Sequence, residues 1–160
     1  MDNTVYEWSI TDIVKFLLSN KSEVDPLNNV METPLHLASS SGHSEIVTIL
    51  IAHDAAIDPK NDREWTPLHL AASFGHTETA KILLRHQAAI DQLDISERTP
   101  LHWAALEGHI EVVKLLFEHG ATIDSKNIVL ETPLHLAGQF DRYYVTKTFQ
   151  ICQNILVGTR

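Results

Sequence analysis

TPLHWAALEGHIEVVKLLFEHGA, residues 99–121, joins a Thr-Pro start to histidines, a tryptophan and a long run of aliphatic residues. Its first four letters, TPLH, occur four times in the chain, beginning at Thr33, Thr66, Thr99 and Thr132. Each copy therefore starts 33 residues after the one before it. A fixed period of this size predicts stacked supersecondary units, because no single unit could bury its own apolar face.

Each unit carries the signals of two helices. Thr followed by Pro starts the first helix, because the hydroxyl can cap it and the proline lacks only an amide proton that the first turn would leave unused. Gly42, Gly75 and Gly108, each followed by histidine, end that helix and begin a second one. The second helix, such as EVVKLL, has a broad apolar face, and a connector rich in turn-forming Asp and Asn follows it. The unit is thus a helical hairpin followed by a short loop.

The TPLH starts and the 33-residue period resemble those of ankyrin-repeat proteins. The resemblance is good over residues 10–137 and loose over 138–156. It implies an all-α ankyrin-repeat solenoid of helix-turn-helix units joined by short β-hairpin-like loops. We expect one domain over residues 1–160. Its expected parts are an N-terminal half repeat at 1–27, full repeats at 28–60, 61–93 and 94–126, and a degenerate C-terminal capping repeat at 127–160.

The chain departs from the family pattern where glycine is usual. At the loop tip, two residues before Thr, it has Met31, Glu64, Glu97 and Leu130, which makes the loop geometry harder to predict than the helices. After the second helix glycine survives only as Gly120, and other residues, Lys21, Asp54 and Gln87, take its place elsewhere. The last unit lacks the Gly-His pair. It keeps apolar residues at helical spacing, as a capping unit should, at Val145, Phe149, Cys152 and Leu156.

Composition limits the functions open to the chain. It is 44% hydrophobic and 21% charged, which is typical of a soluble globular protein, and no apolar run is long enough to insert into a membrane. The single cysteine, Cys152, can form no internal disulfide, in agreement with a cytoplasmic location, the nucleus being the alternative. A net charge of −9 disfavours direct binding of nucleic acid. The acidity suits solubility, or else it steers the chain toward a basic partner.

The ten histidines raise the question of a metal or catalytic site. All ten fall on three repeated positions: within TPLH, after the glycines, and at the ends of the second helices. The family resemblance implies that the TPLH histidine ties the helix start to the loop backbone, while adventitious binding of zinc or nickel is the alternative. Nucleotide-binding, zinc-protease and serine-hydrolase motifs do not occur. Ser39–Ser41 near His43 could suggest a nucleophile and base, but the equivalent positions vary between repeats. We expect no catalytic residue, cofactor or metal.

Positions that differ between repeats are free to encode recognition. By the family resemblance they lie on the loops and at the end of the first helix, where they line a concave face. Aromatic residues and arginine dominate binding hot spots. The expected partner-binding residues are Arg63, Trp65, Phe74, Arg98, Leu106 and Phe140. Trp65 has the alternative role of packing on its neighbouring loop, and we expect Trp103, which replaces a leucine of the other repeats, to be partly core.

These features predict a non-catalytic protein–protein interaction module. It would be a monomer that binds a protein or peptide on its concave face. One alternative is an interaction domain of a larger multidomain protein whose effector activity lies elsewhere. The third possibility is a metal-dependent hydrolase built from the histidines.

Overall fold

The structure, a computed structural model, describes residues 9–139 of the chain. Within this range the regular secondary structure consists of α-helices joined by loops. No helix there is long and apolar enough to cross a membrane. The expected capping helix around Val145–Leu156 and the expected site residue Phe140 lie outside these residues. The helices are α1 (Ile10–Ser19), α2 (Pro34–Ser40), α3 (Ser44–Ala52), α4 (Pro67–Ser73), α5 (Thr77–Arg85), α6 (Pro100–Glu107), α7 (Ile110–Glu118) and α8 (Pro133–Gln139).

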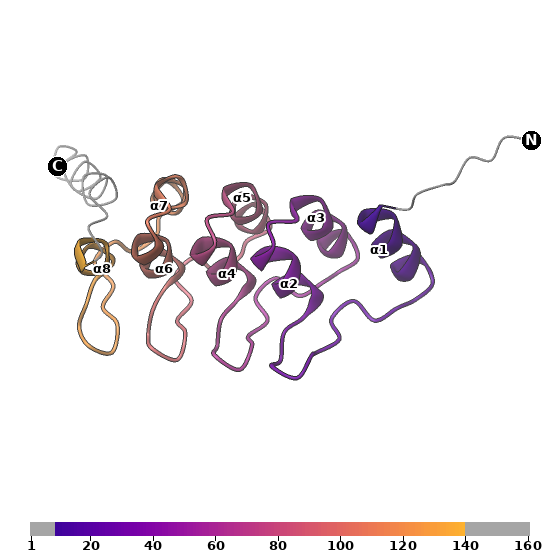
Figure 1. Cartoon of the computed structure of the whole chain (residues 1–160), viewed down its shortest axis with the longest axis horizontal. Helices are drawn as coiled ribbons and strands as arrows, with labels where there is room; N and C mark the ends of the chain where they lie inside the picture. The colour runs from indigo at the N-terminus through magenta and orange to yellow at the C-terminus, as the bar shows by residue number, and fades with distance from the viewer. Residues whose placement is uncertain (1–8, 140–160) are drawn as a thin grey trace, which may run out of the picture.

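The helices form two parallel rows, as the sequence predicts. Helices α2, α4, α6 and α8 pack on one another in the first row, and α1, α3, α5 and α7 do so in the second. Each first-row helix also packs on the second-row helix that follows it, in the pairs α2/α3, α4/α5 and α6/α7. Figure 1 shows the loops projecting from the first row, on the side away from the second. This is the predicted solenoid of helical hairpins.

The first helix of each unit begins at the predicted Thr-Pro. In the second repeat the Thr66 hydroxyl accepts a hydrogen bond from the amide of His69 at 3.4 Å. The ring Nδ1 of His69 in turn accepts from the Thr66 amide at 3.1 Å, which completes a reciprocal capping box. The same pair of bonds starts α2 and α6. The cap therefore depends on the histidine side chain as well as on the threonine.

The break between paired helices needs glycine for two reasons. Gly42, Gly75 and Gly108 have φ angles of 70°, 74° and 81°, in the left-handed region that other residues enter at a cost. A Cβ on Gly42 would also lie 2.5 Å from Nδ1 of His76 in the next repeat. That histidine donates from Nε2 to the carbonyl of Ser40 at 2.9 Å, so it bridges the repeats directly beside the glycine.

The glycine-poor turns keep the left-handed conformation with other residues. After the second helices, Asp54 and Gln87 have φ angles of 65° and 66°. At the loop tips the same conformation occurs at Met31 (59°), Glu64 (57°), Glu97 (56°) and Leu130 (63°). An Asn or Asp three residues before each tip holds it in place. In the second loop, for example, Asn61 Oδ1 accepts from the amides of Arg63 at 3.0 Å and Trp65 at 2.9 Å.

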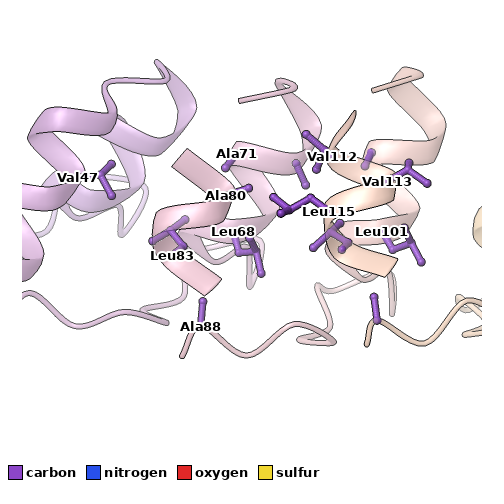
Figure 2. Packing of buried hydrophobic residues seen from close by; sticks show 14 of the residues in the cluster. Val47, Leu68, Ala71, Ala80, Leu83, Ala88, Leu101, Val112, Val113 and Leu115 are labelled. Carbon is purple, nitrogen blue, oxygen red and sulfur yellow. The ribbon is translucent and has the colours of Figure 1, made fainter. Parts of the chain in front are cut away.

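The core lies between the two rows of helices. The TPLH leucines Leu35, Leu68 and Leu101 are fully buried, whereas Leu134 is only partly buried. The small alanines three residues later allow neighbouring helices to approach closely. Figure 2 shows Leu68 and Ala71 of α4 facing Ala80 and Leu83 of α5, with the equivalent α6/α7 layer beside them. The same burial therefore repeats from unit to unit. In such a stack each repeat contacts only its neighbours, so these repeated interfaces stabilise the whole.

The first described helix is less buried than its sequence match implies. By the repeat register, Val14 and Leu17 correspond to Val47 and Leu50, which are core residues. In the structure Val14 is half-buried and Leu17 is 49% exposed. Helix α1 packs on α3, but the described residues include no first-row helix before α2 that could cover its other side. Apolar residues, Leu17 and Leu18 among them, therefore line an open hollow at this end of the stack.

Candidate functional site

The loops and the first-row helices together make a continuous surface. We call it the hairpin face and define it by the loop residues 28–32, 61–65, 94–98 and 127–131 and the exposed sides of α2, α4, α6 and α8. Adjacent loops are joined by single backbone hydrogen bonds of 3.1 to 3.2 Å, from Asp62 to Val30, from Ile95 to Arg63 and from Ile128 to Ser96. The face is therefore a row of connected loops and not a set of independent ones.

The TPLH histidines fix each loop to the helix of the preceding repeat. The ring Nε2 of His36 donates to the carbonyl of Trp65 at 2.9 Å, and His69 and His102 bond in the same way to Arg98 at 3.1 Å and Glu131 at 3.2 Å. Since Nδ1 already accepts a threonine amide, the ring proton must lie on Nε2. The structural role implied for these histidines is the one they have here.

The surroundings of these rings oppose protonation. Burial lowers the pKa of His69 to about 4, although the hydrogen bond to the Arg98 carbonyl acts in the opposite direction. Burial also lowers the pKa of His36 and of His102. All three are neutral at pH 7, and both nitrogens of each ring are engaged in hydrogen bonds. Such a ring cannot serve as a general base without giving up a bond that holds the fold.

Four more of the described histidines hold backbone carbonyls. His109 donates from Nε2 to the Ser73 carbonyl at 3.0 Å, which repeats the bridge made by His76. His53 and His119 bond through Nδ1 to carbonyls in the last turns of α3 and α7, at 2.9 and 2.8 Å. Within residues 9–139 no group of three or more histidine, cysteine or carboxylate side chains is placed to hold a metal ion.

The serines beside His43 do not form a catalytic pair in the described structure. Ser39 is buried, and the Ser40 hydroxyl donates to the Leu37 carbonyl at 3.0 Å within α2. None of the hydrogen bonds in the described part of the chain joins His43 to the hydroxyl of Ser39, Ser40 or Ser41.

The expected partner-binding residues differ in how accessible they are. Arg63 is exposed on the second loop, and Phe74, at the end of α4, is 54% exposed. Trp65, Arg98 and Leu106 are only half-buried, so each offers part of its side chain to solvent. All five lie on the loops or at the end of a first-row helix, as the sequence predicts.

Trp65 packs on the neighbouring repeat. Its ring lies 4.4 Å from the ring of Trp103, centroid to centroid, with the planes at 53°. The Arg98 guanidinium lies 5.0 Å from the Trp103 ring centre, and Trp103 Nε1 donates to Asp94 at 3.0 Å. We call Trp65, Trp103 and Arg98 the aromatic cluster. Trp65 therefore does pack on the next repeat, as its alternative role has it, but on the first helix and not on the loop. Trp103 is half-buried, as expected of a partly core residue.

A hollow of about 340 Å³ lies between the first two loops and α4. It brings together three of the expected residues, Arg63, Trp65 and Phe74, whereas Arg98 and Leu106 do not line it. The other residues that line the hollow are Val30, Glu32, Asn61, Asp62 and Leu70. Leu70 was not expected there, because it occupies a repeated scaffold position. The signal in the sequence is the variation from Glu32 to Trp65 at equivalent positions, because both of these side chains line the hollow.

Comparison with known proteins agrees with this architecture. The family model described as ankyrin repeats (3 copies) matches the chain over residues 6–94, 55–127 and 90–154. A comparison with curated proteins finds no match. Ankyrin repeats are in general protein-interaction modules without catalytic activity. Because the overlapping matches extend over most of the sequence, this chain belongs to the ankyrin-repeat family.

Proposed function

We propose that this chain is a non-catalytic recognition module that binds a protein or peptide on its hairpin face. The observation that carries the proposal is the hollow lined by Val30, Trp65 and Phe74, because it places partly exposed apolar side chains together on a surface that faces solvent. Exposed apolar clusters with a polar rim are typical of interaction sites. The partner-binding residues remain Arg63, Trp65, Phe74, Arg98 and Leu106, together with Phe140.

The connected loops support this role energetically. Histidine-to-carbonyl bonds and loop-to-loop bonds already hold the hairpin face in one conformation. A partner therefore meets a preformed surface, and little conformational entropy of this chain is lost on binding. Binding as a monomer, in the cytoplasm or the nucleus and without nucleic acid, belongs to the same proposal. So does the alternative that the chain is the binding domain of a larger protein with its effector activity elsewhere.

The experiment that tests the proposal is affinity capture with two matched variants. Phe74→Ala removes an exposed ring from the hairpin face, whereas Phe16→Ala removes a ring of nearly equal exposure, 51% against 54%, from α1. We expect Phe74→Ala to weaken binding of the specific partner by about 2 kcal/mol in free energy and Phe16→Ala to have little effect on it. Equal capture by the parent and Phe74→Ala, combined with loss in Phe16→Ala, would place recognition on the second-row side and contradict the proposal.

A further inference from the structure

The hollow between the first two loops has an apolar floor. Leu70 of α4 is almost fully buried beneath it, and Trp65 and Phe74 border it from the loop and from the end of the helix. Val30, which is 42% exposed, closes the side toward the first repeat. An opening of about 340 Å³ is at the small end of ligand sites. It suits an inserted apolar side chain better than a large cofactor.

The rim of the hollow carries more negative than positive charge. Glu32 and Asp62 both line it, and Arg63 supplies the one cation among its lining residues. Neither carboxylate lies within ion-pair distance of a basic side chain in the described part of the chain. By contrast Glu64, on the same loop, is neutralised by Lys60 at 3.1 Å. Two carboxylates are thus left without a cationic partner beside an apolar opening.

The third loop and the end of α6 extend this negative field along the hairpin face. Glu97 and Glu107 are exposed and, within residues 9–139, form no ion pair. The positive charge of Arg98 lies over the Trp103 ring, where the aromatic face already attracts it. With a net charge of −9 for the whole chain, the face attracts basic partners and repels acidic ones.

We infer that the hollow receives an apolar side chain from a basic linear segment of another protein. Lys or Arg residues next to that side chain pair with Glu32 and Asp62. The inference rests on the proposed function, since it names the kind of partner that the hairpin face selects. Apolar insertion supplies most of the affinity, while the carboxylates choose among apolar segments by charge and speed association at low salt.

Selection from a library of random linear peptides displayed on phage, with the full chain immobilised, tests the inference. We expect the enriched peptides to carry an aromatic or large aliphatic residue flanked by Lys or Arg, and their binding to weaken as salt rises. The double variant Glu32→Gln/Asp62→Asn should bind the enriched peptides about tenfold more weakly than the parent, and Phe74→Ala should reduce the affinity by at least as much. The matched control Glu78→Gln/Glu118→Gln removes two exposed carboxylates from second-row helices and should leave binding unchanged.

Each other result overturns the inference, and the variants show whether the proposed function falls with it. Acidic flanks in the enriched peptides, or basic peptides that the rim double variant binds as well as the parent does, overturn the inference. If Phe74→Ala still lowers the affinity for those peptides, the proposed recognition on the hairpin face stands. Peptides unaffected by every hairpin-face variant count against both ideas. If no peptide is enriched, a linear segment is not the occupant, and the capture experiment with Phe74→Ala and Phe16→Ala decides the proposed function separately.

Discussion

The ring of Trp65 lies 4.4 Å from the ring of Trp103, so a side chain on the loop of one repeat packs on the first helix of the next. Phe74, which also varies between repeats, is more than half exposed at the end of α4. Trp65→Ala should therefore lower the free energy of unfolding by about 2 kcal/mol, because it opens a cavity against Trp103. Phe74→Ala should lower it by less than about 0.5 kcal/mol. Urea denaturation followed by circular dichroism measures both values.

This difference decides how binding data on the two variants are interpreted. Loss of binding in Trp65→Ala includes an effect on the fold, whereas loss in Phe74→Ala reports on contact with the partner. Equal destabilisation by the two substitutions would show that Phe74 is also a packing residue, and its use as a binding probe would have to be abandoned.

The non-glycine helix ends make a second prediction. Asp54 and Gln87 are exposed and left-handed, with φ angles of 65° and 66°, a conformation in which a Cβ is strained. Asp54→Gly and Gln87→Gly should each raise the free energy of unfolding by about 0.5 to 1 kcal/mol. Gly120→Ala should do the reverse at its φ of 89°, although no atom lies within 4 Å of the added Cβ. Denaturation midpoints measure these changes. Lower midpoints in both Asp54→Gly and Gln87→Gly would contradict the prediction.

The helices and their ends could be predicted from sequence because their signals are local. Thr-Pro, Gly-His and the helical spacing of apolar residues are signals within one unit. Because Asp54 and Gln87 lie at the repeat position of Gly120, the 33-residue register also predicts a left-handed conformation for them. Asn28, Asn61, Asp94 and Asn127 follow the same 33-residue period, but the sequence alone did not show that these residues hold the loops. Their bonds explain why loops without tip glycines keep one geometry.

The candidate site depends on contacts between units, which no local pattern encodes. Whether Trp65 faces solvent or Trp103 depends on the offset between adjacent repeats and on the rotamers of both side chains. The exposure of Leu17 likewise depends on what lies beside α1 and not on the sequence of α1 itself. Sequence variation between repeats therefore predicts which positions are free to bind a partner, while the structure was needed to separate the packed residues among them from the accessible ones.

The buried TPLH histidines predict a loss of stability in mild acid. The pKa of His69 falls from 6.5 to about 4 in the folded chain, so between these values the unfolded chain binds more protons than the folded one. The stabilisation is complete above pH 6.5 and is lost as the pH falls toward 4. For His69 it amounts to about 3 kcal/mol, and the lowered pKa values of His36 and His102 act in the same direction.

Urea denaturation at neutral pH and at about pH 5 measures this loss, and NMR titration of the imidazole protons assigns it to individual histidines. An imidazole of His69 that titrates at its ordinary pKa in the folded chain, with stability constant over the same range, would contradict the prediction.

Metal analysis tests the rival chemistry of the histidines. If their nitrogens hold the fold together, chain purified without a histidine tag should contain well under one equivalent of zinc or nickel. Chelator should then leave the melting temperature unchanged, because structural zinc contributes directly to folding where it is present. Stoichiometric zinc, combined with a melting temperature that falls on chelation, would revive the hydrolase alternative.

The histidines that follow the glycines provide the last prediction, which concerns how the repeats are joined. His76 and His109 each donate from Nε2 to a carbonyl of the preceding repeat, Ser40 at 2.9 Å and Ser73 at 3.0 Å. Removing either ring leaves that carbonyl without its partner, so His76→Ala and His109→Ala should each lower the free energy of unfolding by about 1 to 2 kcal/mol. His43 occupies the equivalent position in the first full repeat, but it is exposed and its ring forms no hydrogen bond within residues 9–139. His43→Ala is therefore the matched control. It should change the free energy of unfolding by less than about 0.5 kcal/mol. Because the bridge joins neighbouring units, its loss weakens an interface while leaving each helical hairpin intact, and in a linear stack this reduces the cooperativity of unfolding as well as the stability. A lower denaturant slope in His76→Ala than in His43→Ala would show that effect. Equal midpoints and slopes in all three variants would mean that apolar packing alone joins the repeats.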